Sequence, residues 1–214
     1  MTGFHRWSRL LASLLAVLLL AGTTACSRLG QTDDQAQVTR AFQSWKQAMI
    51  SRQTSQAMAY IPGHVDAYLQ ALNSNPGATT SAPAASAPPS ASPGVDLLVR
   101  TALEKKVPAD LRSNLTLAAL MQRITDRRLL NPHDVENIAL GRVSVNGTRA
   151  SAEIYYQGTL TALRLPFIKE ADGWKIDLLS LLPYAEVLMR VDRAMKGQTQ
   201  AQQVDQLVSK LPSL

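Results

Sequence analysis

The sequence of 214 residues is poor in the residue types that hold metals and form crosslinks, with one cysteine and three histidines. A single cysteine excludes an intramolecular disulfide. Zinc sites take three or four cysteine, histidine or carboxylate ligands at short spacings. His64 and His133, the only histidines beyond residue 25, stand far apart and have no second cysteine to join them. The glycines are isolated and form no phosphate-binding loop. We therefore expect neither a metal nor a cofactor.

Basic residues are in mild excess, with 22 Lys and Arg against 16 Asp and Glu and a formal net charge of +6. Residues 1–25 hold two arginines and no acid, so the chain without them has a charge of +4. The charges are scattered, and no basic run is interleaved with aromatic residues. The densest group, Arg123, Arg127 and Arg128 beside Asp126, is typical of a solvated helix surface. We expect no nucleic-acid partner.

The first 26 residues have the organisation of a secretory signal. A basic head at residues 5–9 precedes an apolar run at 10–22, and small residues at 23–25 stand directly before Cys26. This pattern resembles the bacterial lipoprotein signal, in which such a cysteine is diacylated, released by cleavage before it and acylated again. The resemblance implies a signal peptide at 1–25 and an acylated Cys26 that begins a short lipidated tether at 26–32.

The lipoprotein reading predicts a protein held at the membrane of a bacterial cell envelope through Cys26. By the family's sorting rule, Ser27 in place of aspartate favours the outer membrane, facing the periplasm, if the cell has two membranes. Two alternatives stay open. One is an uncleaved membrane span, although the apolar run is shorter than the roughly 20 residues that cross a bilayer. The other is an ordinary secretory signal in which Cys26 is incidental.

One internal segment differs in composition from the rest of the chain. Residues 74–94 hold five prolines and no charged, aromatic or large aliphatic residue. Such a segment buries too little apolar surface to offset its conformational entropy. We therefore predict a disordered insertion rich in Pro, Ala and Ser, and either a surface loop or an interdomain linker fits this composition.

Helical spacing of apolar residues predicts several helices on both sides of this insertion. The first covers 33–60 and places Val38, Phe42, Trp45 and Met49 on one face. A shorter helix follows at 65–72, a third covers 95–106, and a fourth covers 115–130 with Asn114 or Thr116 as its cap. Pro132 is expected to close this helical half.

From residue 138 the apolar period changes to that of strands. Asn146-Gly147 predicts a hairpin between strands at 138–145 and 150–156. A third strand is expected at 159–170, with Pro166 at an edge, bulge or break, and a fourth at 174–182. Helical patterns return after Pro183. We predict an α+β domain over 33–214, in which N-terminal helices pack on about four antiparallel strands and extra helices follow.

An N-terminal helix with an aromatic face, followed by long hairpins whose last turn and strand contain DGWKID at 172–177, resembles the nuclear transport factor 2-like superfamily, which includes ketosteroid isomerase-like enzymes. The resemblance implies a curved sheet that wraps around helices as a cone with an internal pocket. Enzymes of this superfamily use a carboxylate base with polar donors. It makes Glu153, Tyr155, Gln157 and Asp177 the candidate pocket residues, although alternate polar residues are equally typical of a solvated sheet face.

Three functions follow from these patterns. The one we favour is a non-catalytic, lipid-anchored module that binds a small apolar ligand or docks onto an envelope or secretion partner, with the C-terminal helices as a cover or a partner surface. The second is a membrane-tethered isomerase or hydrolase. The third is a structural tether that reaches the cell wall through the proline-rich segment.

The lipid anchor yields the first testable prediction. The Cys26→Ala variant loses the thiol that accepts the lipid, so we expect it to lose the acyl mass and the cleavage after Ala25. Intact mass spectrometry of protein extracted from membranes measures both. The Ser27→Ala variant is the matched control and should keep both, and a wild-type protein with a free thiol at Cys26 would contradict the anchor.

Overall fold

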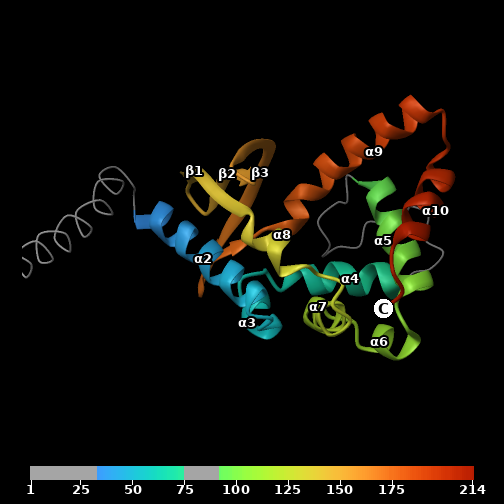
Figure 1. Ribbon diagram of the computed structural model, residues 1–214, viewed down its shortest axis with the longest axis horizontal. Coiled ribbons are helices and arrows are strands. Elements are labelled where there is room, and N and C mark those ends of the chain that lie inside the picture. Colours follow the sequence, from blue (N-terminus) through green and yellow to red (C-terminus); the bar gives the residue numbers. More distant parts are fainter. Residues whose placement is uncertain (1–32, 75–91) are drawn as a thin grey trace, which may run out of the picture. The chain divides into compact units, whose positions relative to one another are not determined.

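A computed structural model describes residues 33–74 and 92–214 (Figure 1). Residues 37–214 form one compact unit, and residues 1–36 are assigned to another, of which only the first turn of a helix is described. The predicted signal peptide, Cys26 and its tether lie outside the described residues. No helix in the described part of the chain combines the length and the apolar character needed to cross a membrane.

Seven helices precede the sheet in the described ranges. Their bounds are α2 Asp33–Ile50, α3 Thr54–Met58, α4 His64–Ser74, α5 Pro93–Lys106, α6 Ala109–Ser113, α7 Leu117–Asp126 and α8 Pro132–Glu136.

The predicted helix at 33–60 is in fact two helices. The break lies at residues 51–53, where Arg52 adopts a left-handed φ of 57°. The cap prediction at 115–130 is confirmed for Thr116, whose hydroxyl accepts the Ala119 N–H, although α7 is shorter than expected. Pro132 begins α8 instead of closing the helical half. Proline suits the first turn of a helix, because the backbone N–H that it lacks would have no partner within the helix at that position.

The predicted insertion at 74–94 is too wide at both ends. Ser74 is the last residue of α4, and Ser92 and Gly94 are buried at the start of α5. The prediction from local composition was wrong for these residues, because they are ordered by contacts with other parts of the chain and not by apolar side chains of their own. Residues 75–91 lie outside the described ranges.

The described residues contain a four-stranded antiparallel sheet in the order β1-β2-β3-β4, which confirms the α+β prediction. The strands are β1 Ile138–Asn146, β2 Arg149–Tyr156, β3 Thr159–Glu170 and β4 Gly173–Ile176. The predicted hairpin is present, with Asn146 paired to Arg149. The fourth strand is shorter than the predicted 174–182, because the chain turns at Asp177 into the 3-10 helix η1 at Leu178–Leu181.

Pro166 lies inside β3, where it pairs with Ser151 of β2. Its carbonyl accepts the N–H of Asp177, so the side of the residue that lacks a donor faces the end of β4. The β3–β4 ladder runs only from Phe167 onward. The proline is therefore tolerated because the neighbouring strand has already ended. This agrees with the edge alternative of the prediction and not with a strand break, since β3 continues through Pro166.

Two helices close the chain, α9 at Leu182–Lys196 and α10 at Gln200–Lys210. Pro183 lies in the first turn of α9. Thr199 and Gln202 form a reciprocal capping box at the start of α10, in which each side chain bonds the other residue's backbone. These bounds agree with the helical patterns expected after Pro183.

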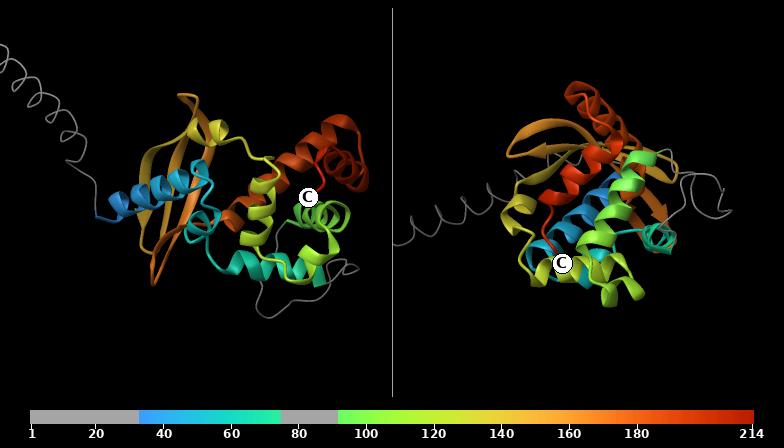
Figure 2. Two further views of the ribbon diagram at one scale, coloured as in Figure 1. Left: turned by 60° about the horizontal axis from the view of Figure 1, so that its bottom comes forward. Right: turned by 90° about the vertical axis from the view of Figure 1, so that its right-hand side faces the viewer.

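The core lies between α2 and one face of the sheet (Figure 2). Val38 and Phe42 of α2 are 0% exposed, and Phe167 and Ile176 of the sheet are each 1% exposed. All four belong to one apolar cluster. The sheet face that the nuclear transport factor 2-like resemblance would open as a pocket is thus packed with side chains.

Phe42 offers a direct test of this packing. Phe42→Ala should lower the free energy of unfolding by about 3–5 kcal/mol, because a fully buried aromatic side chain leaves a cavity when truncated. The neighbouring exposed Gln43→Ala should change it by no more than about 0.5 kcal/mol. Urea unfolding measures both, and an equal effect at the two positions would contradict the described core.

Candidate binding pocket

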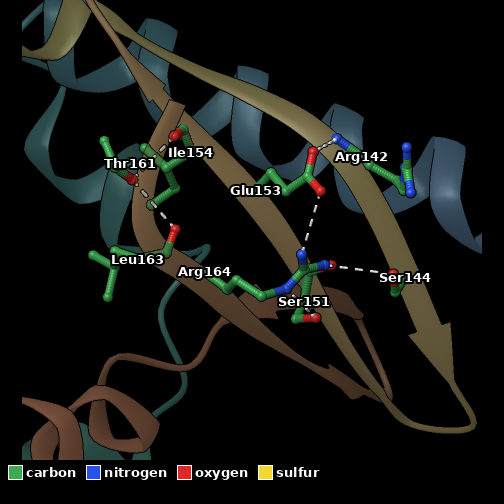
Figure 3. A network of polar contacts seen from close by, with 8 residues as sticks. All are labelled: Arg142, Ser144, Ser151, Glu153, Ile154, Thr161, Leu163 and Arg164. Atoms are coloured by element: carbon green, nitrogen blue, oxygen red, sulfur yellow. Dashed lines mark hydrogen bonds and ion pairs between the residues drawn. The ribbon is translucent and has the colours of Figure 1, made fainter. Parts of the chain in front are cut away.

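Glu153 lies on the face of β2 opposite the core, in a polar network with its neighbouring strands (Figure 3). Its Oε1 is 3.5 Å from Nη1 of Arg164, and its Oε2 accepts the backbone N–H of Arg142 at 3.2 Å. The Arg164 guanidinium also reaches Ser144 and Ser151. This arrangement is a solvated sheet surface in which the carboxylate is already paired.

Tyr155 lies beside Glu153 over Gly141, whereas Gln157 is placed differently. The Tyr155 ring covers Gly141 of β1, where an added Cβ would come within 2.5 Å of Tyr155 Cε2. Gln157 is exposed in the turn after β2, with a left-handed φ of 51°, and its N–H donates to the Asn137 carbonyl. The structure therefore brings Tyr155 and Glu153 together over Gly141, whereas Gln157 lies in the following turn.

Asp177 is buried and caps η1. Its carboxylate accepts the N–H of Ser180 at 3.3 Å and the Ser180 hydroxyl at 2.5 Å. Nε2 of His64 lies 3.6 Å from Oδ1, a contact that sequence analysis missed. Serine, histidine and aspartate therefore meet here, but the serine donates to the aspartate and not to the histidine. A nucleophilic triad requires the histidine between the other two.

The structure thus does not unite the four predicted residues, because Glu153 and Asp177 have separate sets of partners. No group of three or more His, Cys, Asp or Glu side chains that could hold a metal ion occurs within 33–74 and 92–214.

A pocket of about 440 Å³ lies elsewhere, in the helical half between α4, α5, α7 and the C-terminal residues. Its lining is apolar apart from one lysine and consists of Leu69, Leu98, Val99, Ala102, Leu103, Lys106, Val107, Leu120, Ile124, Leu129, Leu211, Pro212 and Leu214. Leu129 and Leu211 remain 41% and 43% exposed, so the pocket is open to solvent beside them.

Buried hydrogen bonds hold the pocket walls in place. The Tyr68 hydroxyl of α4 donates to Oδ1 of Asp96 in α5 at 2.7 Å. Burial, reinforced by Asp96, raises the pKa of Tyr68 above its ordinary value, so the hydroxyl keeps the proton that it donates. This bond fixes the distance between two walls without any contribution from a ligand.

The C-terminal tail forms the remaining wall. The Leu214 N–H donates to the Lys106 carbonyl at 2.8 Å, and Arg127 donates to the Ser213 carbonyl at 3.1 Å. Lys105 pairs with Asp205 of α10 at 2.8 Å, which ties α10 to α5. Figure 1 shows the C-terminus beside α5 and α4.

Among the described residues that line the pocket, Lys106 is the one with a charged side chain. It is half-buried in the last turn of α5. An apolar cavity with one cation suits a molecule with an apolar body and an anionic head, because the cation offsets the desolvation of the head.

Sequence analysis missed this pocket. The helical spacing of apolar residues in 95–106, Leu98 and Ala102 among them, usually indicates the core face of a helix. The sequence does contain a signal for this site, since the apolar stripes of 95–106 and 115–130 each need an apolar surface to pack against. Whether a pocket remains between the two helices depends on the distance at which they cross, which residue spacing does not show.

No protein-family model matches the chain, and the comparisons with curated proteins and with solved structures also give no match. The lipoprotein signal and the nuclear transport factor 2-like fold therefore stay predictions. The geometry of the pocket and of the surfaces around it carries the functional proposal.

The two carboxylates should respond differently to truncation. Asp177→Ala removes a buried capping group, and we expect a loss of about 1–2 kcal/mol in the free energy of unfolding. Glu153→Ala breaks a partly exposed ion pair and should cost less than about 1 kcal/mol. Thermal unfolding of both variants checks this order, and a larger loss for Glu153 would show that the sheet surface network is structurally essential.

Proposed function

We propose that this chain is a lipid-anchored protein of the bacterial cell envelope that binds an apolar ligand with an anionic head, such as a single-chain fatty acid, without transforming it. The observation that carries the proposal is the apolar pocket between α4, α5, α7 and the C-terminal tail, with Lys106 in its lining. Its volume of about 440 Å³ lies in the range of small-molecule sites, roughly 300–1,000 Å³.

The envelope location is supported by the sequence at 1–26, where small residues precede the single cysteine after a basic head and an apolar run. An acylated Cys26 would keep the pocket close to a source of amphiphiles. Because each buried methylene contributes about 0.8 kcal/mol, a multiply acylated cysteine would attach the protein durably.

The isomerase or hydrolase alternative receives less support from the geometry. Glu153 is paired with Arg164 on the outer sheet face, and Asp177 is occupied in capping η1. The sheet face that would form the enzyme pocket is filled by Phe42, Phe167 and their neighbours. The structural tether also remains a hypothesis, because residues 75–91 lie outside the described ranges.

Filling the pocket tests the proposal. Ala102→Trp places an indole in the space between α5 and α7, so we expect the affinity for dansyl-labelled undecanoic acid to fall at least about tenfold. Fluorescence titration measures the affinity. Because the indole enters empty space, the thermal unfolding midpoint should change little.

Ala201→Trp, on the exposed side of α10, is the matched control and should bind the probe as the wild type does. The methyl ester of the probe, which lacks the anionic head, should bind several-fold more weakly than the acid. Equal binding by Ala102→Trp and the wild type would place the probe outside this pocket and contradict the proposal.

A further inference from the structure

Helix α9 presents an apolar stripe to solvent. Its members recur at helical spacing and are all more than 40% exposed: Tyr184 42%, Val187 46%, Leu188 51%, Val191 51% and Met195 76%. An ordinary surface helix buries such a stripe and exposes its polar side. The described residues thus leave the apolar stripe of α9 uncovered.

The opposite side of α9 is polar and packed. Glu186 is 5% exposed, and its Oε2 accepts the backbone N–H groups of Gly94 at 2.7 Å and Val95 at 3.0 Å. Gly94 leaves room for this approach, since an added Cβ would lie 2.8 Å from the Glu186 carboxylate in its present position. The carboxylate thereby satisfies donors in the first turn of α5.

A second contact holds the same side. The Gln203 amide of α10 is 1% exposed and donates to the Met189 carbonyl at 2.9 Å and to the Asp192 carboxylate at 3.0 Å. An ion pair with Lys196, together with the Gln203 bond, lowers the pKa of Asp192. Turning α9 to bury its stripe would leave the Glu186 carboxylate without these partners, at a high desolvation cost. The stripe stays outward.

The size of the stripe argues against a stable protein interface. From Tyr184 to Met195 the helix advances about 17 Å, and with its side chains it is about 10 Å wide. Specific protein complexes bury about 800 Å² on each partner, which is far more than one such stripe offers. A second copy of the chain seated on α9 would therefore associate weakly.

A lipid surface can bind a patch smaller than a protein interface, because each apolar side chain inserts on its own and no complementary shape is needed. Tyr184 has the amphipathic ring typical of the membrane interface. Arg190 is exposed beside the stripe, whereas the acids of the helix are engaged, Glu186 with backbone N–H groups and Asp192 with Lys196. The solvent side of α9 is thus apolar with an unopposed positive charge, which complements an anionic bilayer.

Chain length makes the contact reachable. Ten residues lie between Cys26 and Gln37, the first residue of the compact unit, and the eleven steps from Cys26 to Gln37 span at most about 40 Å. A domain tethered so closely meets the bilayer at a high effective concentration, so a modest apolar patch suffices. This step rests on the lipid anchor in the proposed function.

We propose that the outer face of α9 docks onto the membrane surface, with Val187, Leu188, Val191 and Met195 in the interface between head groups and acyl chains. The acylated Cys26 and α9 then form two attachment points that orient the domain.

Depth-dependent quenching tests the contact. The full chain, acylated at Cys26, is purified as Val191→Cys or Ser209→Cys and labelled with an environment-sensitive dye. Ser209 is an exposed control position on α10. In vesicles of phosphatidylethanolamine and phosphatidylglycerol that contain brominated acyl chains, we expect quenching at 191 to exceed that at 209 several-fold. Adding Val187→Gln and Leu188→Gln should remove most of the difference, whereas Ala201→Gln should not.

Each other outcome overturns the inference in a recognisable way. Equal quenching at 191 and 209, in protein that floats with the vesicles, would contradict docking by α9 while leaving the anchor intact. Shielding of position 191 from aqueous iodide without quenching by brominated lipid would assign the stripe to a second copy. Protein that lacks the acyl mass and does not float would overturn the anchor and, with it, the docking that depends on it.

Discussion

The carboxylate of Glu186 is the contact on which the arrangement of the helical half depends. It joins the second turn of α9 to the first turn of α5, where Gly94 and Val95 present backbone N–H groups. A buried carboxylate is stable only with such donors, and the positive end of a helix provides them. This contact determines which side of α9 faces inward and where α5 begins. The pocket wall formed by α5 and the outward stripe of α9 are both consequences of it.

The two halves of the domain use their apolar residues differently. In the sheet half, α2 covers the strands, and Phe42 and Phe167 leave no exposed surface. In the helical half, α4, α5 and α7 are held apart by buried polar contacts such as Tyr68 to Asp96, and a pocket remains between them. Polar contacts have fixed lengths and directions, whereas apolar packing closes until the space is filled. The pocket therefore lies in the half where polar contacts set the spacing.

Predictions from local patterns were most accurate where one physical signal dominates. The hairpin at Asn146-Gly147, the strand at 159–170, the cap at Thr116 and the helices after Pro183 all depend on neighbouring residues alone. The wrong predictions occurred where the neighbouring residues are compatible with two different structures. Pro132 is compatible with the end of one helix or the start of the next, and the apolar residues after Asp177 suit a strand as well as a turn of 3-10 helix. Glu153 was placed correctly on its strand, whereas Asp177 was expected on the last strand and in fact follows β4 as the cap of η1. The partners of Glu153 come from neighbouring strands, and His64 of α4 lies beside Asp177.

The α+β class, most of the elements and the apolar face of each helix follow from residue spacing along the chain. The argument for a lipid anchor also comes wholly from the sequence, since residues 1–32 lie outside the described structure. Which apolar faces are buried depends instead on tertiary contacts. Periodicity shows that Leu98 and Val191 each belong to a stripe, but not that the first lines a pocket and the second faces solvent. That difference arises from contacts between residues some ninety positions apart, such as Glu186 with Gly94, which no local pattern encodes.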